Sequence, residues 1–200
     1  FCFMKRKNLG INTICTHAGE VKDTQFQGAI SPLFMSSSYQ YDGVDVKRYP
    51  RYFNTPNQEG LGKKIAALEK SEAGMIFSSG MAAVSHCLLA FLHKGDHVVL
   101  PQTLYGGTYN FVVEEFHKFG IEFTFADGFT EKDFAKAIKT NTKVIYAETP
   151  SNPLMKITDL EIIARLAKQH SLVSMIDNTF ASAINQTPAD FGIDIMIHSA

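Results

Sequence analysis

The feature that most constrains the fold is an alternation of short apolar runs with amphipathic segments beyond residue 96. Apolar runs predict strands over 97–100, 121–125, 144–147, 172–176 and 193–197. Apolar residues at helical spacing predict helices over 109–119, 131–139 and 159–170. Short buried strands that alternate with helices build βαβ units. The sequence therefore predicts an α/β fold, with a mostly parallel sheet covered by helices on both faces.

Residues 1–57 have a different character. They lack a sustained hydrophobic period and are interrupted by glycines and prolines, which break regular structure. We therefore expect an extended N-terminal arm with little core of its own, followed by a domain over residues 58–200. This domain should open with a helix that stops near Gly74, a short buried strand at Met75–Phe77, and a helix from Gly80 to about Leu92.

The composition narrows the class of partner. The chain has 19 basic and 20 acidic residues, without the basic excess that is typical of nucleic-acid binders. No stretch approaches the roughly 20 apolar residues that span a bilayer. The first residues place apolar side chains before basic ones, which is the wrong order for a secretory signal. We expect a cytoplasmic protein that binds neither nucleic acid nor membrane.

The cysteines and histidines do not suggest a metal or a disulfide framework. Cys2, Cys15 and Cys87 are odd in number and widely spaced, which favours free thiols. His86 and His93 share a predicted helix, but His97 belongs to the next strand and no acid or cysteine completes a ligand set. We expect no metal site.

Polar motifs follow several of the apolar runs. They are Ser78–Met81, Tyr105–Gly107, Glu148–Pro153 and Asp177–Thr179. Each has an ordinary structural interpretation, namely a helix N-cap, a surface tyrosine, a stiff connector and a turn. In open parallel sheets, however, ligand-binding residues lie at the carboxyl ends of the strands. The repetition of polar motifs at successive strand exits favours a shared ligand site.

The residue types suit a phosphorylated aromatic ring. Backbone amides at a helix N-terminus, with hydroxyls and a glycine, suit a phosphate. Tyr105 could stack on a ring, Asn152 could donate to a phenolic oxygen, and Asp177 could pair with a protonated ring nitrogen. The turn at Ser78–Met81 lacks a Gly-x-Gly-x-x-Gly pattern, so a Rossmann-type dinucleotide site has little support.

This set and order of motifs resembles the Cys/Met-metabolism (transsulfuration) family of pyridoxal-phosphate enzymes, which have the aspartate-aminotransferase type of fold (fold type I). The likeness runs from about Thr13 to Ala200. The motifs that carry it are Tyr49-Pro50-Arg51, Ser79-Gly80-Met81, Leu104-Tyr105-Gly106-Gly107-Thr108, Glu148-Thr149-Pro150-Ser151-Asn152-Pro153, Asp177-Asn178-Thr179-Phe180 and His198-Ser199-Ala200.

The resemblance implies two groups of phosphate-binding residues. Ser79-Gly80-Met81 would form the phosphate-binding turn, with backbone amides of the glycine and the methionine as donors. Ser199 would add a hydroxyl. Tyr49 and Arg51 would reach the phosphate of a neighbouring subunit's cofactor, which accounts for an arm with little core. The family forms homotetramers built as dimers of dimers, and this implies the same assembly here.

The resemblance also assigns residues to the pyridine ring. Tyr105 would stack on it and assist proton transfer or leaving-group departure, and Asn152 would contact its 3-oxygen. Asp177 would hold the ring nitrogen, with Thr179 close by. Tyr105 and Asp177 are thus the expected catalytic residues of this chain.

The sequence also departs from the family pattern. After the Tyr-x-Arg motif the family usually has Asn-Pro-Thr, whereas this chain has Asn54-Thr55-Pro56. Gly107 stands where methionine γ-lyases tend to carry cysteine, which weakens that assignment. The lysine that binds the cofactor would fall shortly beyond Ala200, and the arginine that binds the substrate carboxylate would lie further on. We therefore expect the 200 residues to be the front half of a longer protein.

The resemblance implies an enzyme of sulfur amino-acid metabolism. It would catalyse β- or γ-elimination, or γ-replacement, on cysteine- or homoserine-type substrates, as a carbon–sulfur lyase or a transferase of methionine biosynthesis. Two alternatives remain open from the sequence. One is an aminotransferase of the same fold, and the other is a non-catalytic half-domain that ends at Ala200.

Overall fold

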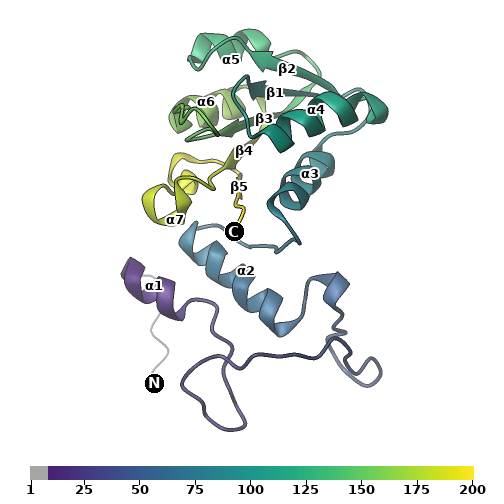
Figure 1. Ribbon diagram of the computed structural model, residues 1–200, viewed down its shortest axis with the longest axis vertical. Helices are drawn as coiled ribbons and strands as arrows, with labels where there is room; N and C mark the ends of the chain where they lie inside the picture. The colour runs from purple at the N-terminus through teal and green to yellow at the C-terminus, as the bar shows by residue number, and fades with distance from the viewer. Residues whose placement is uncertain (1–8) are drawn as a thin grey trace. The chain divides into compact units, whose positions relative to one another are not determined.

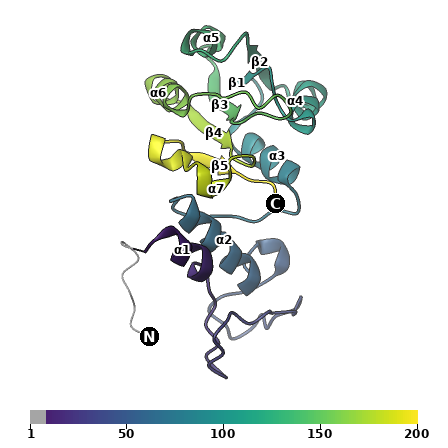
Figure 2. The same cartoon turned by 60° about the vertical axis from the view of Figure 1, so that its left-hand side comes forward.

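The computed structural model describes residues 9–200, so Cys2 lies outside the described residues. The chain divides into two compact units, Phe1–Ile76 and Phe77–Ala200, and each is described by itself (Figures 1 and 2). None of the helices in the described part of the chain has the length and apolar character that crossing a membrane requires.

The second unit is built on a five-stranded sheet. Its strands are β1 (His97–Pro101), β2 (Glu122–Ala126), β3 (Thr142–Glu148), β4 (Val173–Asp177) and β5 (Ile195–Ile197). The order across the sheet is β2-β1-β3-β4-β5, and every neighbouring pair is parallel. All the strands therefore present their carboxyl ends at the same edge.

Helices cover both faces of this sheet. They are α3 (Gly80–Phe91), α4 (Gly106–Phe119), α5 (Glu131–Ala137) and α6 (Leu160–His170), followed by the short α7 (Ser182–Asn185) and the 3-10 helix η3 (Pro188–Phe191). Helices α3 and α4 lie on one face, and α5 and α6 on the other (Figure 2). The predicted α/β class with a parallel sheet is confirmed.

Alternation along the strands divides the core in two, because successive side chains point to opposite faces. In β3, Val144 and Tyr146 pack toward α3 and α4, whereas Ile145 and Ala147 pack toward α5 and α6. Since both faces are buried, the strands appear in the sequence as continuous apolar runs. This is why their positions could be predicted without a period-2 pattern.

The first unit contains little regular structure. It holds α1 (Ile11–His17), the 3-10 helix η2 (Pro50–Tyr52) and α2 (Pro56–Leu68). A capping box between Thr55 and Gln58 starts α2, in which Gln58 Oε1 accepts the backbone N–H of Thr55 at 3.2 Å. Large apolar side chains of the intervening segment are exposed, among them Phe26, Ile30 and Met35. This unit buries little of its own apolar surface.

Two sequence expectations about these elements were wrong. Met75–Phe77 is not a strand, and Met75 is 62% exposed. A strand needs a neighbour for its backbone hydrogen bonds, and no other strand pairs with this run within residues 9–200. The α1 helix was missed because its seven residues bury no side chain and so show no clear apolar stripe. The assignment of residues 1–57 to an intersubunit arm and 58–200 to the cofactor domain stays a prediction.

Candidate functional site

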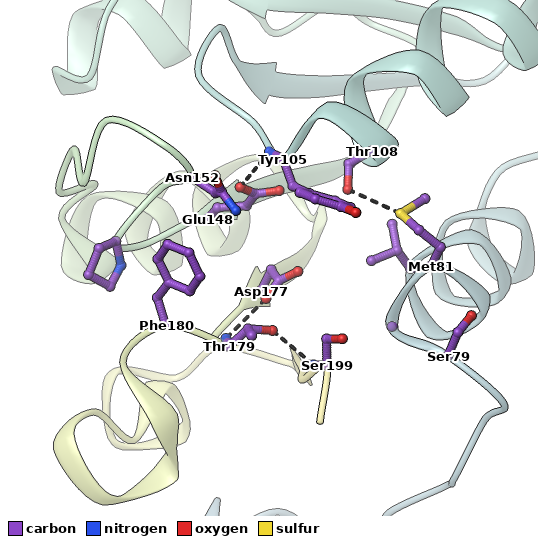
Figure 3. Close-up of a pocket in the computed structure, with 13 residues that line it drawn as sticks. Ser79, Met81, Tyr105, Thr108, Glu148, Asn152, Asp177, Thr179, Phe180 and Ser199 are labelled. Atoms are coloured by element: carbon purple, nitrogen blue, oxygen red, sulfur yellow. Dashed lines mark hydrogen bonds between the residues drawn. The ribbon is translucent and has the colours of Figure 1, made fainter.

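A cavity of about 470 Å³ opens in the second unit at the carboxyl ends of β3 and β4. It is lined by eight of the residues predicted from the sequence: Ser79, Gly80, Met81, Tyr105, Asn152, Asp177, Thr179 and Ser199. Figure 3 shows Tyr105, Asp177 and Ser199 arranged around it. Residues that are as many as 120 positions apart in the sequence therefore meet at one site.

The strand order explains why the cavity lies here. The chain passes from β1 outward to β2, and then to β3 on the other side of β1. Loops on either side of such a switch point diverge and leave a crevice at the carboxyl edge of the sheet. Tyr105 follows β1, Asn152 follows β3, and Asp177 ends β4, so their loops border this crevice.

The N-terminus of α3 forms one wall. Ser79 caps the helix, because its hydroxyl oxygen accepts a hydrogen bond from the N–H of Ala82 at 3.1 Å. The N–H groups of Gly80 and Met81 have no intrahelical acceptor by their position in the first turn. With the positive end of the helix dipole, they can bind an anion.

Ser199 is held directly against this helix end. A Cβ added to Gly80 would lie 2.5 Å from the Ser199 Cβ and 2.6 Å from its hydroxyl oxygen, so the approach requires glycine. The backbone N–H of Ser199 donates to the Thr179 hydroxyl at 2.9 Å. The segment after β5 thereby places a hydroxyl beside the first turn of α3.

Tyr105 lies at the start of α4, on the opposite side of the site. Its side chain is 48% exposed, and its backbone N–H donates to Glu148 Oε2 at 2.8 Å. The ring lies against Gly107, where an added Cβ would come within 2.6 Å of the Tyr105 Cε1 and 3.0 Å of the Met81 Sδ. The phenol is thus available for stacking on a ligand in the cavity.

Two carboxyl groups stand at the strand ends. Glu148 ends β3 and pairs in register with Asp177, which ends β4. Asp177 Oδ1 accepts a hydrogen bond from the N–H of Thr179 at 3.0 Å. Burial raises the pKa of Glu148 to about 7, the N–H of Tyr105 opposes this shift, and the charge of Asp177 adds to it. Glu148 therefore ionises less readily near neutral pH than an exposed glutamate does.

The loop that carries Asn152 is fastened to its neighbours. Thr149 accepts a hydrogen bond from the N–H of Thr158 through its hydroxyl at 3.1 Å, and from the Gln186 side chain through its carbonyl at 2.9 Å. The same Gln186 amide donates to the Asn178 side chain at 2.8 Å. Because Asn178 directly follows Asp177, this network ties the Asn152 loop to the end of β4.

Tyr49 and Arg51 are not among the residues that line the cavity. They belong to the first unit, where Arg51 Nη1 donates to the Tyr49 hydroxyl at 2.5 Å. Their assignment to a neighbouring subunit's phosphate stays a prediction.

The cavity also contains residues to which sequence reasoning gave no role, including Val84, Thr108, Glu148 and Phe180. Glu148 could have been found, because an acid at the end of an apolar run becomes buried when that run enters a sheet. Thr108 is fully buried and donates to the Met81 sulfur at 3.7 Å. It belongs to the Leu104–Thr108 motif, but nothing in that motif indicates its contact with Met81.

The site suits a planar, phosphorylated ring with a cationic nitrogen. It offers an open helix N-terminus, a glycine that admits a close approach, an aromatic ring and a carboxylate. The fold and the site thus define an α/β protein with a cavity at the carboxyl edge of its sheet whose lining suits a phosphorylated ring. The sequence matches Cys/Met metabolism PLP-dependent enzymes over residues 12–200. The chain belongs to this family.

Similar proteins are found among enzymes of sulfur amino-acid metabolism. Cystathionine beta-lyase MetC of Bacillus subtilis (strain 168) is 44% identical over 170 residues, which cover 85% of this chain and 42% of that protein. The crystal structure of metB from Corynebacterium glutamicum has a TM-score of 0.92 at 34% identity, over 98% of this chain and 51% of that one.

A third similar protein carries a pyridoxyl-lysine group in its solved structure. It is a putative O-acetylhomoserine (thiol)-lyase (metY) from Campylobacter jejuni with N'-pyridoxyl-lysine-5'-monophosphate. Its TM-score is 0.89 at 31% identity, over 96% of this chain and 50% of that one. The chain spans about half the length of the relatives that it matches.

Proposed function

We propose that this chain forms much of the pyridoxal-phosphate site of an enzyme that acts on cysteine- or homoserine-type amino acids. The reaction would be β- or γ-elimination or γ-replacement. The observation that carries the proposal is the convergence of Tyr105, Asp177 and the α3 N-terminus on one cavity. Membership of a family of PLP-dependent enzymes of Cys/Met metabolism supports it.

The phosphate would bind at α3. The N–H groups of Gly80 and Met81 would donate to its oxygens, and the Ser79 and Ser199 hydroxyls would flank them. The contact between Gly80 and Ser199 supports this assignment, since it keeps a hydroxyl next to the helix N-terminus without blocking it. A phosphate dianion there would also be stabilised by the helix dipole.

The ring would lie between Tyr105 and the strand ends. Bound pyridoxal phosphate supplies an electron sink for the negative charge that develops on a substrate carbon. Asp177 would keep a proton on the ring nitrogen, Tyr105 would stack on the ring face, and Asn152 would donate to the 3-oxygen. Thr179 would support Asp177, because its N–H already donates to that carboxylate.

The assembly and location of the complete protein belong to the same proposal. We infer a homotetramer in which Tyr49 and Arg51 of one subunit complete the phosphate site of another. The exposed apolar side chains of residues 26–35 support a covering partner for the first unit. A cytoplasmic location remains a prediction from the sequence.

The role of Asp177 can be tested in the complete protein. Asp177→Ala should abolish release of α-ketobutyrate or pyruvate from sulfur amino acids and weaken cofactor retention, because the ring nitrogen loses its counter-charge. Asp194→Ala, at the amino end of β5, is the matched control. Wild-type turnover in Asp177→Ala would contradict the proposal, and amino transfer to a keto acid would identify an aminotransferase instead.

A further inference from the structure

The Glu148 carboxyl lies almost entirely beneath the cavity surface, with a relative exposure of 3%. Oε2 accepts the N–H of Tyr105 at 2.8 Å, whereas Oε1 is buried and makes no hydrogen bond of ordinary geometry within residues 9–200. A buried carboxylate that lacks donors is costly, because the lost hydration is not replaced. The surroundings of Glu148 therefore favour its neutral form.

The groups that face Glu148 point to the same conclusion. Asp177 is its partner in the register of β3 and β4, and neighbouring residues of paired strands project to the same face. Tyr146 lies two residues earlier on that face, and its buried hydroxyl faces the Glu148 carboxyl. Beyond Tyr146 lies the Cys87 thiol of α3, whose pKa is raised by burial.

The interactions with these groups can be compared. Ionised Glu148 would stand beside the negative charge of Asp177, whereas the N–H groups of Tyr105 and Asn152 and the hydroxyl of Tyr146 favour ionisation. Burial and the repulsion from Asp177 outweigh these three groups and raise the pKa of Glu148 to about 7. The neutral acid keeps the hydrogen bond from Tyr105 and avoids the second charge.

Through its hydrogen bond to the backbone of Tyr105, Glu148 influences the position of a side chain that lines the cavity. Tyr105 precedes the first turn of α4, and its N–H has no acceptor within that helix by position. Glu148 Oε2 fixes the backbone from which the ring projects, while Gly107 sets the position of the ring itself. A change at Glu148 would therefore act on Tyr105 through the backbone of that residue.

Resting on the proposed function, we propose that Glu148 is a positioning residue for Tyr105. Below neutral pH it is a neutral carboxylic acid that holds the start of α4 and leaves the negative charge of the strand pair on Asp177. Gln at this position would preserve both the acceptor oxygen and the neutral state. Ala would remove the acceptor.

Hydrogen exchange of the Tyr105 amide tests the positioning role in the cofactor-free form of the complete protein. Glu148→Ala should speed this exchange about tenfold, as expected for the loss of a bond worth about 1.4 kcal/mol. In Glu148→Gln the exchange rate of the Tyr105 amide should stay within about threefold of the wild-type rate, because the amide oxygen of Gln still accepts the hydrogen bond. Asp194→Asn is the matched control, since its carboxylate accepts the N–H of Ser174 at 2.9 Å away from the cavity.

Unchanged exchange in Glu148→Ala would overturn the positioning role, and equally fast exchange in Glu148→Gln would overturn the neutral form. Should Glu148→Ala not fold, a second measurement on Glu148→Gln decides the question. The visible circular dichroism of bound pyridoxal phosphate should change with a midpoint near pH 7 in the wild type and show no such transition in Glu148→Gln. A wild-type transition in Glu148→Gln would contradict the proposal.

These two measurements separate the inference from the proposed function. If the complete protein binds no pyridoxal phosphate, the proposed function fails. The exchange rate of the Tyr105 amide in the cofactor-free protein still decides whether Glu148 positions Tyr105.

Discussion

Gly80 and Ser199 are in contact at the mouth of the cavity, with so little space that a Cβ on Gly80 would lie 2.5 Å from the Cβ of Ser199. This contact joins the first turn of α3 to the segment after β5. It brings together the backbone N–H groups and the hydroxyl that we assign to one phosphate. The contact depends on a missing side chain, so it can be tested by adding one.

Gly80→Ala should weaken the binding of pyridoxal phosphate to the complete protein. The methyl group forces Ser199 away from the helix, and overpacking of this kind costs about 1–3 kcal/mol, which corresponds to about fivefold to 150-fold in the dissociation constant. Fluorescence titration of the cofactor-free protein measures it. Gly106→Ala is the control, because an added Cβ at the first residue of α4 meets nothing within 4 Å. Equal affinities in the two variants would refute the assignment.

Gly107→Ala should displace the Tyr105 ring. The new methyl would come within 2.6 Å of the ring carbon Cε1 and 3.0 Å of the Met81 sulfur, so the ring has to rotate away from the cavity wall. We expect an altered visible circular dichroism of the bound cofactor. Turnover should fall about tenfold, which corresponds to a rise of about 1.4 kcal/mol in the activation free energy. Gly106→Ala again serves as the control. A wild-type spectrum in Gly107→Ala would show that Tyr105 does not contact the cofactor.

Gln186→Ala should loosen the two loops that carry Asn152 and Asp177. The Gln186 amide links the Thr149 carbonyl to the Asn178 side chain, and removal of a partner from a buried network costs about 1–3 kcal/mol. Urea unfolding should show this loss, together with weaker cofactor binding. Asn185→Ala, at the exposed neighbouring position, should change neither quantity. If Gln186→Ala loses stability but keeps the wild-type affinity for the cofactor, the network supports the fold and not the cofactor site.

His97 should make the second unit sensitive to acid. Its ring is fully buried between the hydroxyls of Thr142 and Thr124, at 2.8 and 2.9 Å. Burial lowers the pKa of His97 from 6.5 to about 4, with a smaller contribution from Lys139. Between pH 4 and pH 6.5 the imidazole of His97 therefore binds a proton more readily in the unfolded chain than in the folded chain. Stability is therefore complete above pH 6.5 and is lost as the pH falls toward 4, by about 3 kcal/mol in all.

The comparison of wild type and His97→Gln isolates this effect. The variant cannot titrate at this position, so its free energy of unfolding in urea should fall less steeply between pH 6.5 and 4, whatever its stability at pH 7. His170→Gln, on an exposed side chain at the end of α6, provides the control. Identical slopes for wild type and His97→Gln would mean that His97 is not the group responsible.

The sequence predicted the sheet well because the strands are buried on both faces. A run such as Val144–Ala147 is apolar throughout, which is typical of a strand covered on both faces. Met75–Phe77 has the same apolar character but finds no strand partner among the described residues. Apolarity indicates that a segment avoids water, whereas a strand also requires a neighbour for its hydrogen bonds.

The candidate site was predictable to a similar degree. The motifs around Tyr105 and Asp177 stand at strand exits, and parallel strands deliver such exits to one edge. Glu148 received no role because its significance depends on its register with Asp177 and on its bond to the backbone of Tyr105. Neither relationship can be obtained from the spacing of residues along the chain.

The sequence by itself determined the class of fold, the family and the residues that could hold a phosphorylated ring. These follow from local order, namely apolar runs, turn residues and motifs at fixed spacing. Only the tertiary structure decided which acids become neighbours, which glycines are required by a close contact, and which carboxyl group has its pKa raised by burial. Those properties arise from distances between segments far apart in the chain, and the packing of the sheet and its helices sets them.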